Sequence, residues 1–320
     1  MTAPVTAAPD SVVCVACRTS GRLAPLYRGC VDRISWIPGR FDVLRCTACG
    51  LGRTVPQPAP DELAAFYPRS YVSFACSGSP LGNSGRRARW LLRRPYARRY
   101  GEPERTLQPG RPGARLLDVG CGVGAYLEEM ARLGWEPWGV ELSPHAAAAA
   151  AQRLETPAER IFVGRVEDAR FGDESFDLVT MSHVLEHLSD PAVVLARIRR
   201  WLWPTGTLRI WVPNLASLEA RTFRRLWFGL DVPRHLWHFT PQSLTALLDH
   251  AGFAVERLVP EYQASSLAGS VALLRDALVF RRRPYRNSRR LYYGLYPLAS
   301  IQLALGQAAS VDCVARKAAS

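Results

Sequence analysis

The sequence is poor in lysine, and its first residues do not have the pattern of a secretory signal. Lys317 is the only lysine among 320 residues, so arginine carries almost all of the positive charge, and we interpret this bias as genomic rather than functional. The first residues, MTAPVTAAPDSVV, lack a basic start followed by an apolar run. This argues against a secretory signal and predicts a flexible tail over residues 1–11. We therefore expect a cytoplasmic protein with reduced thiols. Its eight cysteines are then expected to be metal ligands or buried thiols rather than disulfides.

Long apolar runs are also missing. The longest uncharged stretch, 291–311, is interrupted by Gly294, Pro297, Gln302 and Gly306. A helix that spans a bilayer needs about 20 predominantly apolar residues. We therefore expect a buried helix here, with a segment that lies at a membrane interface as the alternative.

The net charge of +13 is concentrated in two windows. Residues 77–112 contain nine arginines against two glutamates, and residues 275–290 contain seven arginines against one aspartate. Such windows favour basic patches that face phosphates, a membrane surface or nucleic acid, and solvated helix faces are the alternative. Because the two windows account for the whole net charge, the rest of the chain is balanced.

From residue 114 the sequence alternates between short apolar strands and amphipathic helices. Apolar residues make up 48% of the chain, enough for a sizeable core. Ser143 and Asp190, each followed by proline, are typical N-caps of two of the helices. The pattern predicts an α/β protein with a doubly wound parallel sheet. The expected strands are ARLLDVG, EPWGVEL, RIFVG, FDLVTMSHV, GTLRIWVP, FAVERLV and SVDCVARKA.

The stretch LLDVGCGVGAYL places three glycines between the first of these strands and its helix. Gly120, Gly122 and Gly124 allow a ligand to approach the backbone and the free N–H groups of the helix N-terminus. The spacing also fits a dinucleotide-binding turn. Asp118 separates the two interpretations, because its carboxylate would repel a pyrophosphate and would suit a cationic amine. S-adenosylmethionine has an ammonium group, a sulfonium group, a ribose and no phosphate.

Four blocks in series carry a resemblance to the class I S-adenosylmethionine-dependent methyltransferases: LLDVGCGVGAYL, GVELSPHA, GRVEDARFGDESFDLV and SHVLEHLSDP. The resemblance implies a seven-stranded Rossmann-like sheet with a reversed last strand over residues 112–320, with insertions at about 214–240 and 262–309. It also implies a cofactor site for S-adenosylmethionine. Asp118 and the backbone of Gly120, Gly122 and Gly124 would hold the methionine end. Glu141 would bind the ribose, Leu142 would pack on the adenine, and Asp168 with the Glu167 backbone would lie at its edge.

Two cysteine pairs precede this domain, and their spacing is typical of a structural zinc site. The proposed ligands are Cys14, Cys17, Cys46 and Cys49, which predict a zinc ribbon over residues 12–57. The 28 residues between the pairs exceed the usual ribbon spacing, so we expect an inserted hairpin or loop. Buried thiols or a redox pair are the alternative. Residues 58–111 would form a basic linker with lid helices, and Tyr67 and Tyr71 would fold over the cofactor.

Methyl transfer to a hydroxyl or to a carbon acid requires a base close to the cofactor methyl group. His183 and His187 follow the fourth strand, and His235 and His238 lie in the segment DVPRHLWHFTP. We select His183, His235 and His238 as candidate bases and expect His187 to make a local hydrogen bond. A catalytic metal held by the four histidines is not favoured, because the next helix begins only near Asp190. Arg234 could pair with a phosphate or carboxylate of the substrate.

These observations lead to two main functional hypotheses. A zinc ribbon before such a domain resembles sugar-modifying methyltransferases of polysaccharide gene clusters and certain ribosomal RNA methyltransferases. The first hypothesis is O- or C-methylation of a sugar or glycan-linked acceptor, nucleotide- or lipid-linked, with peripheral membrane contact through 275–311. The second is RNA methylation, which is less favoured because SHVL stands where many RNA-amine enzymes carry an Asn-Pro-Pro-Tyr-like block. A non-catalytic partner is opposed by the intact Asp118, glycines and Glu141.

Overall fold

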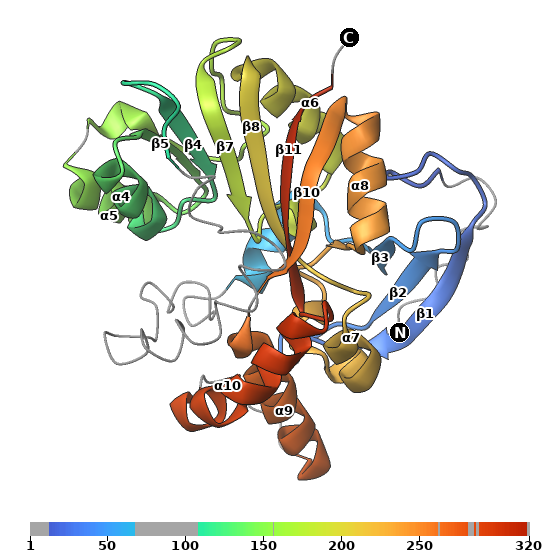
Figure 1. Cartoon of the computed structure of the whole chain (residues 1–320). Helices are drawn as coiled ribbons and strands as arrows, with labels where there is room; N and C mark the ends of the chain where they lie inside the picture. Colours follow the sequence, from blue (N-terminus) through green and yellow to red (C-terminus); the bar gives the residue numbers. More distant parts are fainter. Residues whose placement is uncertain are drawn as a thin grey trace.

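The computed structural model of the chain describes residues 13–67, 108–155, 157–261, 263–280, 285 and 288–318. The predicted tail, Tyr71 and most of the predicted lid segment lie outside the described residues, as do most arginines of the first basic window. Within the described residues, a large mixed sheet is joined to a smaller N-terminal sheet and to a helical insertion (Figure 1).

The large sheet has seven strands in the order β10-β11-β8-β7-β4-β5-β6. Neighbouring strands from β6 to β8 are parallel, whereas β11 is antiparallel to both β8 and β10. This arrangement confirms the predicted α/β class and the reversed last strand. The strands are β4 (Arg115–Val119), β5 (Glu136–Glu141), β6 (Ile161–Val163), β7 (Phe176–Ser182), β8 (Leu202–Pro213), β10 (Phe253–Glu261) and β11 (Ser310–Lys317).

Two of the helices between these strands begin at the predicted caps. The Ser143 hydroxyl accepts a hydrogen bond from the Ala146 N–H, and the Asp190 carboxylate accepts from the N–H groups of Ala192 and Val193. Each cap satisfies backbone donors that the first helical turn leaves free. The helices are α4 (Ala125–Arg132), α5 (Pro144–Leu154), α6 (Pro191–Trp201) and α8 (Pro241–His250), with short 3-10 turns η5 (Ala158–Arg160) and η6 (Leu185–His187).

The N-terminal sheet has three strands of its own and borrows a fourth. Its order is β1 (Leu23–Cys30), β2 (Phe41–Cys46), β3 (Gly52–Val55) and β9 (Trp237–His238). The β1–β2 hairpin occupies the gap between the two cysteine pairs, as predicted. Gly52 pairs with His238, and a Cβ atom on Gly52 would lie 2.8 Å from the Cβ atom of His238. The close approach of β3 to β9 therefore requires glycine at this position.

Helices outside the sheet come from three segments. Residues 60–66 form α1 (Pro60–Leu63) and η2 (Ala64–Phe66), and the chain after β8 forms α7 (Leu218–Phe223), η7 (Arg224–Leu226) and η8 (Phe228–Leu230). Between β10 and β11 lie α9 (Ala264–Leu278) and α10 (Arg289–Ala304), which pack together near the carboxyl edge of the sheet (Figure 1).

α10 covers most of the uncharged stretch, but only one of its faces is buried. Leu303 is buried, whereas Leu298 and Ile301 are about half exposed. The expectation of a buried helix is therefore met on one side alone. Among the residues described, no helix combines the length and apolar character that crossing a membrane would require.

A buried guanidinium joins the N-terminal sheet to the large domain. Arg234 is fully buried, and its Nη2 and Nη1 donate to the two Asp32 carboxylate oxygens at 2.6 and 3.0 Å. It also pairs with Asp231 and donates to the Phe66 carbonyl at 3.0 Å. This corrects the expectation that Arg234 pairs with an anionic group of the substrate, because its guanidinium already pairs with the carboxylates of Asp32 and Asp231.

Removal of the Asp32 carboxylate should destabilise the fold strongly. Asp32→Ala leaves a buried cation with Asp231 as its remaining carboxylate partner, and losing one partner of a buried pair costs about 3–5 kcal/mol. We expect a clearly lower midpoint of thermal or guanidinium unfolding by circular dichroism. Asp173→Ala, which breaks an exposed pair with Arg200, is the control and should change little. Equal midpoints for the two variants would contradict the anchoring role of Asp32.

Candidate active site

The glycine turn between β4 and α4 has one position that faces open space. Gly120, Gly122 and Gly124 all have left-handed φ angles, of 77°, 55° and 75°. A Cβ atom on Gly120 would lie 2.5 Å from Val184 Cγ2, and one on Gly124 would lie 3.0 Å from Ala150 Cα. Beside Gly122 no atom lies within 4 Å of the same position. The outer glycines therefore permit tight packing, and the middle one leaves room for a ligand to approach the backbone.

Asp118 lies at the end of β4 with its side chain almost fully buried. Its Oδ1 accepts a hydrogen bond from the Thr180 hydroxyl at 2.7 Å. Burial raises the pKa of Asp118 to about 7, since it outweighs that hydrogen bond, and the nearby negative charge of Glu141 raises the pKa further. A cationic group placed beside this carboxyl would favour its ionised form.

Glu141, at the end of β5, is held against the same turn. Its Oε2 accepts the Gly122 N–H and its Oε1 accepts the Ser143 N–H, both at 2.8 Å. Leu142 follows with 61% of its surface exposed, an unusual exposure for a large apolar residue beside a glycine turn. Glu167 pairs with Arg165 at 3.0 Å, and Asp168 is exposed. The predicted cofactor residues thus come from the carboxyl ends of β4 and β5 and from the loops that follow β4, β5 and β6.

His183 directly follows β7 and is the most accessible of the candidate bases. Its φ angle is 55°, and its side chain is 31% exposed. Nδ1 lies 3.2 Å from Glu186 Oε1, and Nε2 lies 3.1 Å from the Gln263 amide nitrogen. Since the amide can only donate, Nε2 accepts and Nδ1 donates to the carboxylate. Burial alone would lower the pKa of His183, but the bond and charge of Glu186 outweigh it and raise the pKa.

His238 lies in β9 with 2% of its surface exposed. The Thr54 hydroxyl donates to the His235 carbonyl at 2.7 Å, so it accepts the N–H of His238 Nε2 at 2.9 Å. Burial lowers the pKa of His238 to about 3, and the charge of His235 lowers it further. A ring without access to solvent is poorly placed to take a proton from a substrate, so this environment favours a structural role for His238.

His187 and His235 face each other across a ring-centroid distance of 4.6 Å. His187 Nδ1 lies 3.0 Å from the Arg234 carbonyl and 2.9 Å from the Tyr67 hydroxyl. The expected local hydrogen bond of His187 is therefore wrong, because the Arg234 carbonyl is 47 residues away in the sequence. His235 Nδ1 lies 2.9 Å from the Gly229 carbonyl. Burial lowers the pKa of His187 to about 4, and the charge of His235 adds to the effect.

Glu186 connects these histidines, and sequence reasoning did not select it. It is 1% exposed and lies between His183 and His235, with Oε1 4.0 Å from His235 Nε2. Burial would raise the pKa of Glu186, but the His183 hydrogen bond and the charges of the surrounding histidines lower it to about 2. The available signal was a carboxylate within SHVLEH, between two histidines directly after a buried strand.

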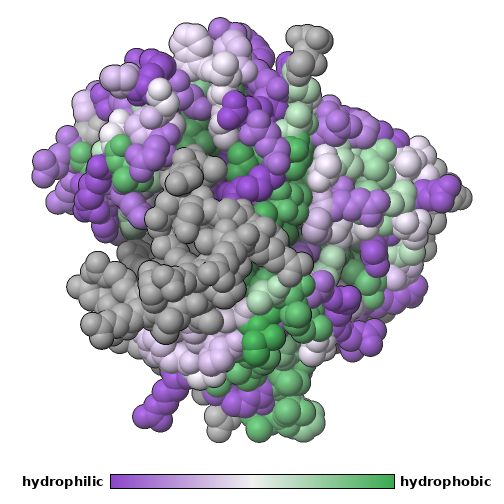
Figure 2. Space-filling model, viewed as in Figure 1, coloured by the Kyte–Doolittle hydropathy of each residue, from purple (hydrophilic) through white to green (hydrophobic). Residues whose placement is uncertain are grey.

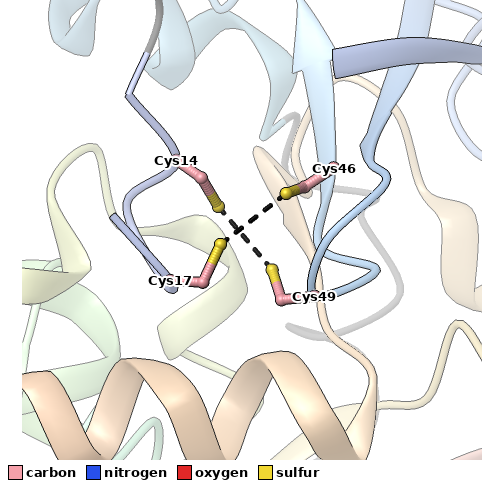
Figure 3. A group of neighbouring side chains, drawn as sticks. All are labelled: Cys14, Cys17, Cys46 and Cys49. Carbon is pink, nitrogen blue, oxygen red and sulfur yellow. Dashed lines mark hydrogen bonds between the residues drawn. The ribbon is translucent and has the colours of Figure 1, made fainter. Parts of the chain in front are cut away.

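The four predicted zinc ligands converge beside the N-terminal sheet, at the end of β2 (Figure 3). The Sγ atoms of Cys14 and Cys49 are 3.7 Å apart, and so are those of Cys17 and Cys46. Zinc–sulfur bonds of about 2.3 Å in a tetrahedron place the sulfurs about 3.8 Å apart. The hydrogen bond with Cys49 lowers the pKa of Cys14 to about 5, despite its burial. The cluster is compatible with a zinc ribbon.

The mixed seven-stranded sheet, the glycine turn and the carboxylates at the ends of β4 and β5 define a class I S-adenosylmethionine-dependent methyltransferase. Over residues 90–258 the chain matches the family described as "Methyltransferase domain". Because the match covers more than half of the chain, the protein belongs to this family and is an S-adenosylmethionine-dependent enzyme.

Two similar sequences agree with this assignment. A ubiquinone biosynthesis O-methyltransferase of Xanthomonas campestris pv. campestris is 42% identical over 190 residues, which are 56% of this chain and 71% of the relative. One of Azorhizobium caulinodans is 29% identical over 179 residues, 52% of this chain and 69% of the relative. A crystal structure of an S-adenosylmethionine-dependent methyltransferase from Mesorhizobium loti is 20% identical, with a TM-score of 0.44, and covers 67% of this chain and 95% of its own.

Cofactor affinity should depend on pH through Asp118. Since burial raises the pKa of this carboxyl to about 7, a bound ammonium group should displace its proton below neutral pH. We expect the affinity for S-adenosylhomocysteine to fall by up to about tenfold per pH unit below about pH 7, and to level off above it. Calorimetric titration at several pH values, in buffers of different ionisation enthalpy, measures both the affinity and the released proton.

Two variants test the assignment of this pH dependence. Asp118→Asn should bind more weakly and without proton release, whereas Asp249→Asn, an exposed aspartate on α8, should behave as the wild type. A wild-type affinity that is constant from acid to neutral pH would show that Asp118 does not face the cofactor amine.

Proposed function

We propose that this methyltransferase methylates a hydroxyl oxygen of a small, hydroxyl-rich acceptor, with a sugar or glycan-linked compound as the preferred class. The observation that carries the proposal is the hydrogen-bonded pair of His183 and Glu186 beside the glycine turn. An accessible imidazole backed by a buried carboxylate is suited to removing a hydroxyl proton. The similar proteins named as O-methyltransferases support oxygen as the acceptor atom.

The surroundings of His183 support a polar acceptor. Gln263 directs its amide toward the ring, and Glu261 lies close enough for its charge to raise the pKa of His183. Burial raises the pKa of Glu261 itself to about 7, and its Oε2 has no hydrogen-bond partner among the described residues. Several unsatisfied or exchangeable polar groups at one edge of the sheet suit a ligand with several hydroxyl groups.

In the proposed reaction, S-adenosylmethionine supplies the methyl group and leaves as S-adenosylhomocysteine. Asp118 and the backbone at Gly122 would hold its methionine end, and Glu141 its ribose. The acceptor hydroxyl would replace the Gln263 amide at His183 Nε2, which takes the hydroxyl proton. Glu186 would keep Nδ1 protonated and stabilise the imidazolium that forms, in the way that a buried carboxylate supports a catalytic histidine.

We also propose a structural zinc ion at Cys14, Cys17, Cys46 and Cys49. Each pair forms a knuckle in which the residue after the second cysteine, Arg18 or Gly50, has a left-handed φ angle. The Arg18 N–H donates to the Cys14 carbonyl, and the Gly50 N–H donates to the Cys46 carbonyl, both at 2.9 Å. Four thiolates leave no open position on zinc, so the ion would stabilise the ribbon without taking part in the reaction.

The helical insertion is proposed to rest on an anionic membrane surface. Leu278 is the last residue of α9, and Val279 and Phe280 follow it. These side chains are 71%, 54% and 93% exposed. Apolar residues over α9 and α10 form a continuous apolar area on the lower part of the molecule in Figure 2. In the sequence, three arginines follow Phe280 directly. Exposed apolar side chains next to basic ones are typical of interfacial membrane segments, and such a position would suit a lipid-linked acceptor.

An acceptor screen tests the proposed function. Release of S-adenosylhomocysteine is measured with nucleotide sugars, lipid-linked glycans, a catechol that represents quinol acceptors, and RNA. We expect turnover on a sugar-containing acceptor, and kcat lower by about 100- to 10,000-fold in His183→Ala. His250→Ala, an exposed histidine on α8, is the matched control. For a lipid-linked acceptor, Phe280→Asp should reduce turnover on vesicles but not on a soluble analogue.

Two outcomes of the screen would overturn the proposal. Turnover on RNA alone, with steep salt dependence, would assign the chain to nucleic-acid methylation. Turnover on the catechol alone would show that the acceptor has the chemistry of the similar proteins rather than that of a sugar.

Metal analysis tests the structural zinc ion. Purified wild-type protein should contain zinc that Cys46→Ser loses, together with a lower unfolding temperature, since the binding energy of a structural zinc ion contributes to folding. Cys30→Ala is the matched control, because Cys30 is a buried cysteine outside the cluster. Equal zinc content in wild type and Cys46→Ser would refute the assignment.

A further inference from the structure

Three side chains outside the zinc cluster bring together the atoms that transition metals prefer. One carboxylate oxygen of Glu186 and one ring nitrogen each of His187 and His235 all lie within 4.8 Å of one another. Metal–ligand bonds of about 2.0–2.2 Å imply ligand separations of about 3 to 3.6 Å. The 4.0 Å between Glu186 Oε1 and His235 Nε2 is close to that range. A small inward movement of the side chains would therefore enclose an ion.

Nδ1 of each imidazole lies beside a backbone carbonyl oxygen. His187 Nδ1 lies 3.0 Å from the Arg234 carbonyl, and His235 Nδ1 lies 2.9 Å from the Gly229 carbonyl. A carbonyl only accepts hydrogen bonds, so each Nδ1 carries the proton, and the Tyr67 hydroxyl, 2.9 Å from His187 Nδ1, then accepts from it as well. Each Nε2 keeps a lone pair. Metal-bound histidines usually donate their second N–H to a carbonyl or a carboxylate in this way.

The carboxylate supplies a second, independent observation. Glu186 is 99% buried, and its Oε2 has no hydrogen-bond partner among the described residues. A buried carboxylate oxygen without a partner is costly, and an ion is one of the few groups that can compensate it. His183 Nδ1 donates to Oε1, the oxygen that lies 4.0 Å from His235 Nε2. A carboxylate oxygen has two lone pairs, so the carboxylate could bind an ion through Oε2, or through both oxygens, and keep that hydrogen bond.

We propose that Glu186, His187 and His235 bind a divalent first-row transition-metal ion with at least one coordination position open. Two imidazoles and one carboxylate suit such ions better than magnesium or calcium, which prefer oxygen ligands. Two segments bring the three ligands together. The 3-10 turn η6 supplies Glu186 and His187, and the segment that Arg234 anchors to Asp32 supplies His235. This site does not require His183 and His187 to lie on one helix as a His-x-x-x-His motif, which would be incompatible with α6 beginning only at Pro191.

The role of the ion rests on the proposed function. An acceptor hydroxyl bound at the open position would be more acidic than in water. Its proton would pass to His183 Nε2, its oxygen would form the bond to the methyl carbon, and the sulfur–carbon bond would break. The sulfonium then becomes the neutral thioether of S-adenosylhomocysteine. No oxidant or reductant takes part, since the metal acts as a Lewis acid only.

Cobalt binding to the purified full-length protein tests the site without any substrate. Co²⁺ at the four cysteines gives intense thiolate charge-transfer bands, whereas Co²⁺ at Glu186, His187 and His235 gives d–d bands without them. We expect wild-type protein to show both classes. In Glu186→Gln, the affinity for the Co²⁺ that gives d–d bands without thiolate bands should fall by at least about 100-fold, and the thiolate bands should remain. Even the loss of an outer hydrogen bond to a metal ligand can lower metal affinity that much.

The controls separate the two metal sites from each other and from the fold. Cys46→Ser should keep the class without thiolate bands, and His250→Ala should match the wild type. His235→Ala is a second ligand variant, and binding of S-adenosylhomocysteine with an unchanged circular dichroism spectrum shows that each variant is folded. Two results would refute the metal site. One is a wild-type spectrum with thiolate bands alone, and the other is d–d bands without thiolate character that persist in both Glu186→Gln and His235→Ala. Because this result uses no acceptor, it is independent of the acceptor screen.

Discussion

The buried pair between Arg234 and Asp32 is the contact on which the geometry of the histidine segment depends. Asp32 lies between β1 and β2, where its carboxylate also accepts the N–H groups of Ile34 and Ser35. A guanidinium removed from water requires such partners at ideal distances. The pair therefore positions one loop of the N-terminal sheet and the chain on either side of Arg234 in a single interaction.

Both histidine environments follow from this anchor. Immediately after Arg234, His235 turns toward Glu186, and the Leu236 N–H donates to the Glu186 carbonyl at 2.8 Å. Three residues after His235, His238 enters the N-terminal sheet and pairs with Gly52. Residues 234–238 therefore contact the candidate active site of the large sheet through His235. They also supply the fourth strand of the N-terminal sheet, beside which the cysteine cluster lies. This connection gives the N-terminal sheet a positioning role in addition to its own stability.

The features that the sequence predicted well are those governed by local chemistry. The alternation of strands and helices, the caps at Ser143 and Asp190 and the hairpin between the cysteine pairs each depend on neighbouring residues. Contacts across long sequence distances could not be predicted in this way. Arg234 and Asp32 are 202 residues apart, and an arginine beside histidines has the same composition whether it meets a substrate or a buried aspartate. Glu186 is three residues from its partner His183, so a local signal was present, whereas only the folded chain brings His235 near it.

The borrowed strand β9 has a consequence for the synthesis of the chain. The cysteine cluster and the strands β1, β2 and β3 are complete once residue 55 has been made, but their fourth strand is Trp237–His238. Domains generally fold as units while the chain emerges from the ribosome, the N-terminal part first. Here the β3 edge of the N-terminal sheet stays without its partner strand β9 until residue 238 has emerged. An early metal ion at the four cysteines would then hold the ribbon together before the rest of its sheet exists.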